Sequence, residues 1–93
     1  MDIIRIDPDF APETHTVSNT SAQSSPIITG SGIIRIAVTS GTHVKFGVNP
    51  TATTEDLLIP ENQVQYFSFK SGQVVAFIHH GGGSGEINIC AVD

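Results

Sequence analysis

The chain has 93 residues, of which 39% are hydrophobic and 14% are charged, and its formal net charge is −5. A chain of this length forms one small domain, which buries only about 60–65% of the surface that the unfolded chain exposes. The four basic residues are spread along the sequence and are too few to neutralise a row of phosphates, so direct nucleic-acid binding is not expected.

Cysteine content and hydropathy restrict the setting further. Cys90 is the only cysteine, so an intramolecular disulfide is excluded, and its apolar neighbours predict a strand side chain rather than a reactive thiol. No apolar run approaches the roughly 20 residues that span a bilayer, and the first residues lack the pattern of a signal peptide. We therefore expect a protein without a membrane partner that is made in a reducing cytoplasm and stabilised by oligomerisation.

Apolar and polar residues alternate along most of the chain, and turn residues interrupt them at the short intervals typical of a sandwich or barrel. No segment has the apolar spacing of a helix. The expected strands, in chain order, are 3–6, 14–17, 27–29, 33–39, 42–48, 57–59, 64–70, 73–79 and 86–92. The short turns at 40–41 and 71–72 predict two β-hairpins, each joining the strands on either side.

The expected fold is all-β, a single compact antiparallel β-sandwich, for which a jelly roll is one compatible arrangement. Residues 1–25 are expected to form an extended arm and a polar loop, and residues 26–93 the sandwich domain. Pro8 and Pro12 limit the first apolar piece to an arm, because proline withholds a ladder donor. The residues at the tip of this arm must be buried on the domain or on a neighbour, and they are candidate contacts: Ile3, Ile4, Arg5 and Ile6.

Alternation also predicts which side chains face the core, because successive residues of a strand point to opposite faces. Ile34, Ile36 and Val38 share one face of their strand. The same spacing assigns six more residues to the core: Val44, Phe46, Val48, Ile87, Ile89 and Ala91.

Residues 79–83, HHGGG, carry the pattern that most invites a chemical interpretation. A His-Gly-Gly-Gly motif builds the oxyanion hole of some esterases, but those enzymes also need a serine elbow in an α/β fold. Residues 82–86, GGSGE, do not match that elbow, and no helix follows them. A loop between two strands explains the glycines better, because glycine adopts positive φ without steric cost.

Metal binding by histidines is the second chemical alternative. Adjacent strand residues point to opposite faces, so His79 and His80 would not share one ion while the strand is regular. His15 or His43 would have to complete such a site, or a symmetric trimer could bring three copies of one histidine together on its axis. We expect no metal and no cofactor, and we keep His79 and His80 as candidate contacts.

The acidic residues do not favour catalysis or calcium binding. The acidic residues nearest the N-terminus lack the spacing of a calcium-binding loop: Asp2, Asp7, Asp9 and Glu13. The later ones lie at strand ends or in loops, where a shared cleft for glycoside hydrolysis is not expected: Glu55, Asp56, Glu61 and Glu86. No serine is set apart as a nucleophile. We therefore expect no enzymatic activity, and a small metal-dependent cupin is the enzymatic alternative.

Residues 43–60, HVKFGVNPTATTEDLLIP, belong to the most specific pattern in the chain. An Ile-Arg-Ile strand at 34–36 precedes them, and an aromatic strand at 66–69, a Val-Ala-x-Ile strand and a final Gly-x-Ile-x-Ile segment follow. This pattern, over about residues 32–92, resembles small β-rich virion proteins of tailed phages, and among them most closely the capsid decoration, or cement, proteins.

The resemblance implies a structural protein that binds the outer surface of a phage capsid and stabilises its lattice. Its expected partners are further copies of the chain, as a homotrimer, and the major capsid protein. It is expected on the virion surface after synthesis in the host cytoplasm. The alternative is a tail- or fibre-associated structural or host-glycan-binding module. Four residues of the loop within the pattern are further candidate capsid or subunit contacts: Asn49, Pro50, Thr51 and Thr53.

Overall fold

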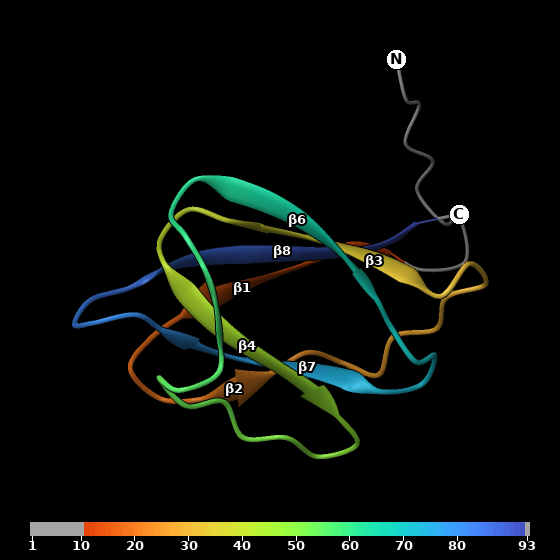
Figure 1. The fold of residues 1–93 in the computed structure, drawn as a ribbon, viewed down its shortest axis with the longest axis horizontal. Helices are drawn as coiled ribbons and strands as arrows, with labels where there is room; N and C mark the ends of the chain where they lie inside the picture. Colours follow the sequence, from red (N-terminus) through yellow and green to blue (C-terminus); the bar gives the residue numbers. More distant parts are fainter. Residues whose placement is uncertain (1–10, 93) are drawn as a thin grey trace.

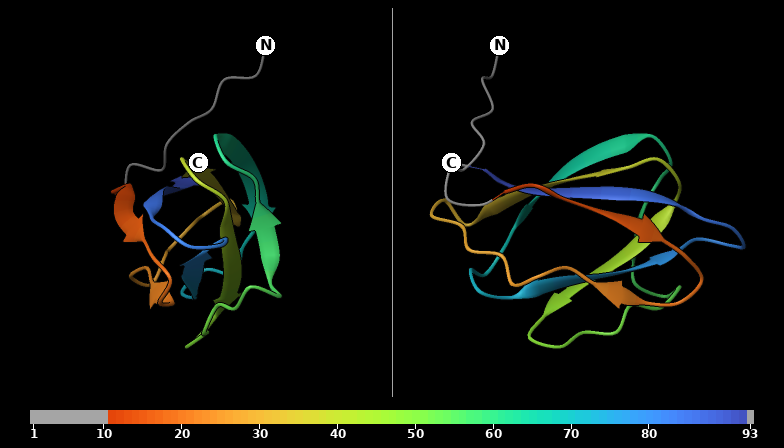
Figure 2. Two further views of the ribbon diagram at one scale, coloured as in Figure 1. Left: turned by 90° about the vertical axis from the view of Figure 1, so that its left-hand side faces the viewer. Right: turned by 180° about the vertical axis from the view of Figure 1, so that it is seen from behind.

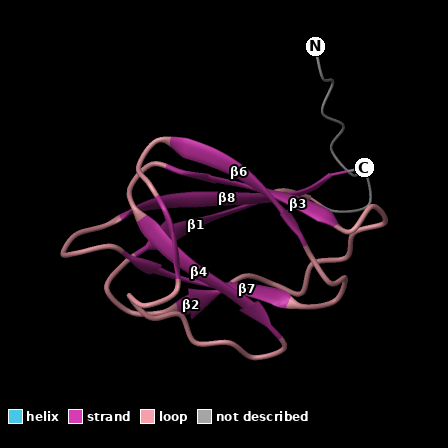
Figure 3. Ribbon diagram, in the orientation of Figure 1, coloured by secondary structure: helices cyan, strands magenta, loops and turns pink. Residues whose placement is uncertain are grey.

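The computed structural model describes residues 11–92, which consist of β-strands and their connections (Figures 1 and 3). The candidate contacts Ile3, Ile4, Arg5 and Ile6 lie outside these residues. Eight strands follow in chain order: β1 (Glu13–Val17), β2 (Ala22–Gln23), β3 (Ile33–Val38), β4 (Thr42–Gly47), β5 (Leu57–Ile59), β6 (Gln63–Ser68), β7 (Val74–His79) and β8 (Gly85–Val92). The described part contains no helix of the length and apolarity that a membrane crossing requires.

The strands form two four-stranded antiparallel sheets that pack face to face (Figure 2). Sheet A has the strand order β1-β8-β3-β6 and sheet B has the order β2-β7-β4-β5. The predicted antiparallel β-sandwich is therefore confirmed. β1 pairs with β8, β2 with β7, β3 with β6 and β4 with β5, so the chain follows the path of one long hairpin folded over into two layers.

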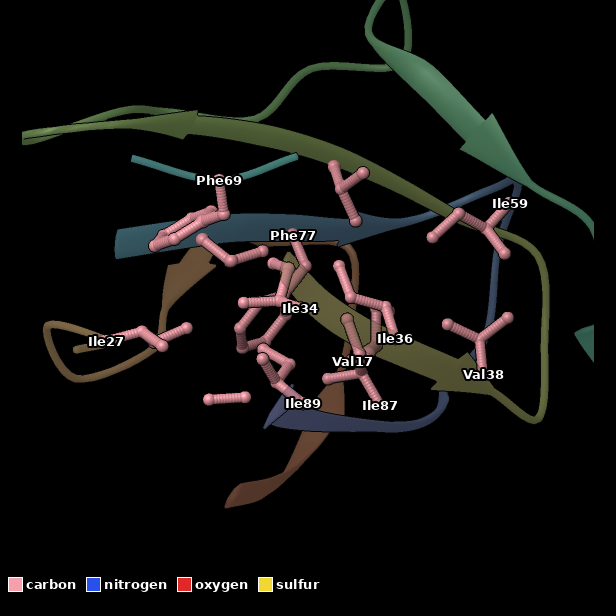
Figure 4. Close-up of a cluster of buried hydrophobic side chains, with 13 residues drawn as sticks. Val17, Ile27, Ile34, Ile36, Val38, Ile59, Phe69, Phe77, Ile87 and Ile89 are labelled. Atoms are coloured by element: carbon pink, nitrogen blue, oxygen red, sulfur yellow. The ribbon is translucent and has the colours of Figure 1, made fainter. Parts of the chain in front are cut away.

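The hydrophobic core fills the space between the two sheets (Figure 4). Ile34, Ile36 and Val38 of β3 point inward, as the alternation of their strand predicts. The buried cluster draws on both sheets and the loops between them: Val17, Ile27, Ile34, Ile36, Val38, Val44, Ile59, Phe69, Val75, Phe77, Ile87, Ile89 and Ala91. Full burial of one such large side chain stabilises the fold by about 1.5–3 kcal/mol relative to exposure, so this cluster is the main source of stability.

Two connections that the sequence presents as hairpin turns pass between the sheets instead. β3 lies in sheet A and β4 in sheet B, and β6 lies in sheet A and β7 in sheet B. The predicted hairpins of 33–39 with 42–48 and of 64–70 with 73–79 are therefore wrong. Alternation identifies the buried face of a strand, but the inner faces of two packed sheets have the same pattern, so it does not identify the sheet.

Within residues 11–92 the sandwich begins at Glu13 rather than at the expected boundary between residues 25 and 26. β1 pairs with β8 from Glu13 opposite Ile89 to Val17 opposite Gly85, and β2 pairs with β7. The expected edge strand at 14–17 is thus confirmed, but it belongs to the sandwich and not to a separate arm. The polar sequence concealed this because Val17 is the only fully buried residue that β1 supplies.

Two local predictions also differ from the structure. Residues 27–29 are not a strand, although Ile27 is buried and its backbone N–H donates to the Gln73 carbonyl at 2.9 Å. Val48 does not face the core and is 83% exposed. It follows the last residue of β4, Gly47, where the alternation of the strand no longer controls the direction of the side chain.

Candidate functional site

One end of the sandwich gathers the β3–β4 connection and the glycine-rich loop between β7 and β8 (Figure 1). The His80 backbone N–H donates to the Gly41 carbonyl at 2.9 Å. The Ser40 hydroxyl donates to the Ser84 carbonyl at 3.4 Å, on the far side of the glycines. These bonds hold the glycine-rich loop against the β3–β4 connection, so the two loops form one surface.

A groove of about 420 Å³ lies in this surface and extends to the turn between β5 and β6. Its lining combines apolar, hydroxyl, carboxylate and imidazole groups: Ser40, Gly41, Leu58, Pro60, Glu61, His79 and His80. Loops at one end of a rigid sandwich are a common place for binding sites, because the scaffold positions side chains that remain accessible. We take this groove as the candidate functional site.

His43 supports the groove from the outer face of sheet B. Its side chain is only 4% exposed, and both ring nitrogens have partners. Nδ1 lies 2.9 Å from the carbonyl oxygen of Asp56, and Nε2 lies 2.9 Å from Nδ1 of His80. A carbonyl oxygen only accepts hydrogen bonds, so Nδ1 of His43 must carry a proton. In the neutral ring, Nε2 of His43 then accepts, and Nδ1 of His80 must be the donor.

This chain of hydrogen bonds sets the chemistry of His80. With its proton on Nδ1, the neutral His80 ring keeps a lone pair on Nε2, and the residue is exposed. An imidazole whose other nitrogen donates to a fixed partner is held in one tautomer and one orientation. His80 is therefore arranged to accept a proton or a hydrogen bond, or to ligate a metal, through Nε2.

The other histidines do not add ligands beside this nitrogen. His79 is buried on the inner side of sheet B whereas His80 is exposed, so His79 and His80 have opposite orientations as expected. His15 lies on β1, and its Nε2 is 2.8 Å from Oε1 of Glu13. Within residues 11–92, no three His, Cys, Asp or Glu side chains gather closely enough to hold a metal ion.

The loop from residue 48 to residue 56 is fastened to its own domain. The side-chain amide of Gln23 donates to Oδ1 of Asn49 at 2.9 Å and to the Pro50 carbonyl at 2.7 Å. The Ala52 backbone N–H donates to the Ser21 hydroxyl at 2.9 Å. β7 lies between β4 and β2 in sheet B, so a loop that leaves β4 and is bonded to β2 crosses the outer face of that sheet. Two residues of the loop, Pro50 and Ala52, are buried.

The candidate contacts in this loop therefore differ in their availability. Asn49 and Pro50 are engaged with Gln23, whereas Thr51 and Thr53 are exposed. The Thr53 backbone N–H donates to Oδ2 of Asp56 at 2.7 Å, which closes the turn that presents the Asp56 carbonyl to His43. The loop thus meets the histidine pair at its last residues only.

The sequence did not reveal the connection between His43, Asp56 and His80. The two histidines are 37 residues apart, His43 on β4 and His80 directly after β7. Asp56 contributes its backbone carbonyl rather than its carboxylate. Neither residue type nor spacing in a sequence indicates a contact between a side chain and a distant backbone carbonyl, such as that of His43 with Asp56. The only signal was the alternation of β4, which places His43 on the face opposite the core residue Val44.

A second surface feature lies on the two edge strands β5 and β6. Among the described residues, seven large hydrophobic side chains are exposed, and four of them lie on these two strands. The four residues are Leu57, Leu58, Val64 and Tyr66. We call this set the β5–β6 apolar surface. The set wraps around the edge of the sandwich where β5 and β6 lie together: Val64 and Tyr66 face outward from sheet A, and Leu58 faces outward from sheet B and lines the groove. Exposed apolar residues gathered at one edge are typical of protein-binding sites.

Comparison of the chain with protein family models, with curated proteins and with solved structures found no match. The features of the molecule that bear on its function are the groove, the pair His43 and His80, and the β5–β6 apolar surface.

Proposed function

We propose that the protein is a structural, non-enzymatic protein that binds the outer surface of a phage capsid and stabilises its lattice. The observation that carries the proposal is the β5–β6 apolar surface, which exposes Leu57 to 54% and Tyr66 to 46%. A chain of net charge −5 remains soluble while such a surface buries itself against another protein. The capsid as the partner comes from the pattern in residues 32–92.

We also propose that the sandwich is a jelly roll. Its strand orders, β1-β8-β3-β6 and β2-β7-β4-β5, fit two Greek keys wound into facing sheets. Jelly rolls occur in viral capsid proteins, in lectins and in cupins, so the architecture is compatible with the capsid role but does not select it.

In this proposal the copies gather as homotrimers on the virion after synthesis in the host cytoplasm. The arm carrying Ile3, Ile4, Arg5 and Ile6 adds to the capsid or to a neighbouring subunit as an extra strand. Thr51 and Thr53, which are exposed, contribute polar contacts. Many modest contacts repeated over a lattice give a high avidity without one strong site.

The test is binding of the purified protein to expanded capsids, followed by imaging of the decorated particles. Leu57→Lys is expected to reduce the bound copy number strongly, because it places a charge in the apolar contact. Val48→Lys is the matched control, since Val48 is exposed but lies outside the β5–β6 apolar surface. A protein that never binds capsids, or a Leu57→Lys variant that binds as well as the Val48→Lys control, would contradict the proposal.

The groove favours a second candidate, a tail- or fibre-associated module that binds a host glycan. Its polar groups include the Ser40 hydroxyl, the Glu61 carboxylate and Nε2 of His80, and all three can accept hydrogen bonds from sugar hydroxyls. Saturable binding to one sugar class on a glycan array, lost in Glu61→Gln, would favour this function. If the protein binds no sugar on the array, the glycan-binding function is excluded.

A further inference from the structure

β6 is the edge strand of sheet A, and within residues 11–92 it pairs with β3 alone. Its sequence, QVQYFS, contains no charged residue and no proline. Edge strands are usually protected by charge, by proline or by shortness. The other three edges have such protection: β1 carries Glu13, β2 has two residues, and β5 has three residues followed by Pro60. β6 is thus the only long, unprotected edge among the described strands.

The hydrogen-bond register shows which backbone groups of β6 face away from the protein. The Phe69 backbone N–H donates to the Gly32 carbonyl at 2.7 Å, and Ile33 lies opposite Ser68. In an antiparallel pair, the N–H and C=O of every second residue point to the same neighbour. Phe67 and Gln65 therefore bond to β3, whereas the backbone groups of Val64, Tyr66 and Ser68 point outward from the edge.

Two of these three residues, Val64 and Tyr66, present apolar side chains on the outer face of sheet A. Phe67 packs against the core, so its neighbours along the strand point away from it. Val64 is 44% exposed and Tyr66 is 46% exposed. The unpaired backbone groups and the apolar side chains therefore occur on the same residues, which is the arrangement that accepts an additional strand.

We propose that β6 pairs in antiparallel orientation with β6 of a second copy of this chain. In the register centred on Tyr66, this residue lies opposite its own counterpart, and Val64 lies opposite Ser68 of the second copy. All three residues with outward backbone groups then exchange hydrogen bonds across the edge. Sheet A becomes continuous across the two copies, about a twofold axis perpendicular to the joined strands.

A second copy is the occupant that the geometry of the edge favours. The chain carries a net charge of −5, so two copies repel each other over most of their surfaces, but β6 brings no charge to the contact. An antiparallel edge is also its own complement about a twofold axis. The inference does not rest on the proposed capsid role, although on a lattice the same contact would join neighbouring copies.

The pairing is expected to be weak in dilute solution. One strand pair of six residues, even with the side chains beside it, buries less than the roughly 1,200–2,000 Å² of stable interfaces. Association should therefore be concentration-dependent, and it should increase where copies are crowded on a surface.

Amide hydrogen exchange measured by NMR at increasing protein concentration tests the proposal. In the monomer, the amides of Gln65 and Phe67 are protected by β3, whereas those of Val64, Tyr66 and Ser68 exchange rapidly. At high concentration we expect protection to appear at the second set, in parallel with dimers in sedimentation equilibrium. Rapid exchange of the second set at every concentration, or protection that does not depend on concentration, would overturn the proposal.

Three variants separate the edge contact from folding. Val64→Pro removes an outward N–H, which edge strands tolerate, and should weaken dimerisation about tenfold or more, because the twofold contact loses one donor from each copy. Val64→Thr keeps the donor and the β-branched shape, and should dimerise like the unchanged protein. Tyr66→Lys places two like charges opposite each other and should abolish the dimer without using proline. A dimer that survives both Val64→Pro and Tyr66→Lys would contradict β6 pairing.

Discussion

His43 shows at the scale of one residue how a buried polar ring determines the state of an exposed one. A buried imidazole needs a partner for each nitrogen, since an unsatisfied buried polar atom costs about 1–3 kcal/mol. His43 obtains these partners from the Asp56 carbonyl and from His80. Because His43 holds Nδ1 of His80 as one of these partners, the lone pair on Nε2 of His80 points away from His43.

The histidine pair leads to a prediction about tautomers. Both His43 and His80 should carry their proton on Nδ1 at neutral pH, because the Asp56 carbonyl accepts at one end of the chain of bonds. Long-range proton–nitrogen NMR correlations distinguish the two tautomers of each ring. In Asp56→Asn the same pattern should persist, because the backbone carbonyl remains and the amide oxygen can still accept from the Thr53 N–H. Observation of the Nε2-protonated form of His43 would contradict the assigned chain of bonds.

Burial also separates Ile36 from Val48, two β-branched residues that look alike in the sequence. Ile36→Ala is expected to lower the free energy of unfolding by about 2–5 kcal/mol, because Ile36 is fully buried between the sheets. Val48→Ala should change it by less than about 0.5 kcal/mol, because Val48 is 83% exposed. Chemical denaturation measures both values. A large loss of stability for Val48→Ala would contradict the position of this residue at the surface.

At the scale of elements, the glycine-rich loop contains glycines with different roles. A Cβ atom on Gly85 would lie 2.6 Å from Oγ and 2.7 Å from Cβ of Ser40, so the start of β8 needs a glycine to pass the β3–β4 connection. A Cβ atom on Gly82 would have no heavy atom within 4 Å. The two positions are only three residues apart, yet a close approach constrains just one of them.

This difference predicts unequal effects of alanine. Gly85→Ala should lower the free energy of unfolding by about 1–3 kcal/mol, because Ser40 must move to relieve the clash. Gly82→Ala should be neutral within about 0.5 kcal/mol. Thermal or urea unfolding of the two variants provides the comparison. Equal stabilities would show that the loop does not pass close to Ser40.

The two inner strands of sheet A, β3 and β8, follow the alternation of the sequence closely. The alternation of 33–39 and 86–92 located β3 and β8 and their buried residues, because a strand with one buried face must alternate. The same reasoning predicted hairpins between β3 and β4 and between β6 and β7, which lie in different sheets. A turn of two residues with a glycine is compatible with a hairpin and with a crossing between sheets, so the local sequence could not decide between them.

At the scale of the whole molecule, the termini of the described chain meet in one sheet. β1 lies beside β8, β2 beside β7 and β3 beside β6, so most strand pairs join distant parts of the sequence. β4 and β5 are the only consecutive strands that pair with each other among the described ones. Such a topology must close large loops before its core can form.

The topology predicts slow folding for a domain of this size. Stopped-flow refolding should proceed over milliseconds to seconds, the range of sandwiches dominated by distant contacts. The two sheets share one core, so equilibrium unfolding should be a single cooperative transition by fluorescence of Tyr66 and by circular dichroism. Refolding within microseconds, or separate transitions for the two signals, would contradict a single core of this topology.

The sequence by itself determined the all-β class, the approximate strands and seven of the thirteen residues of the buried core cluster, because alternation and turn residues are local properties of the chain. Only the tertiary structure decided which sheet receives each strand, that the sandwich starts at Glu13, and that His43 connects Asp56 with His80. It also decided which backbone groups of β6 face outward. These features depend on contacts between residues far apart in the chain, and backbone groups, which make several of those contacts, have no sequence signature.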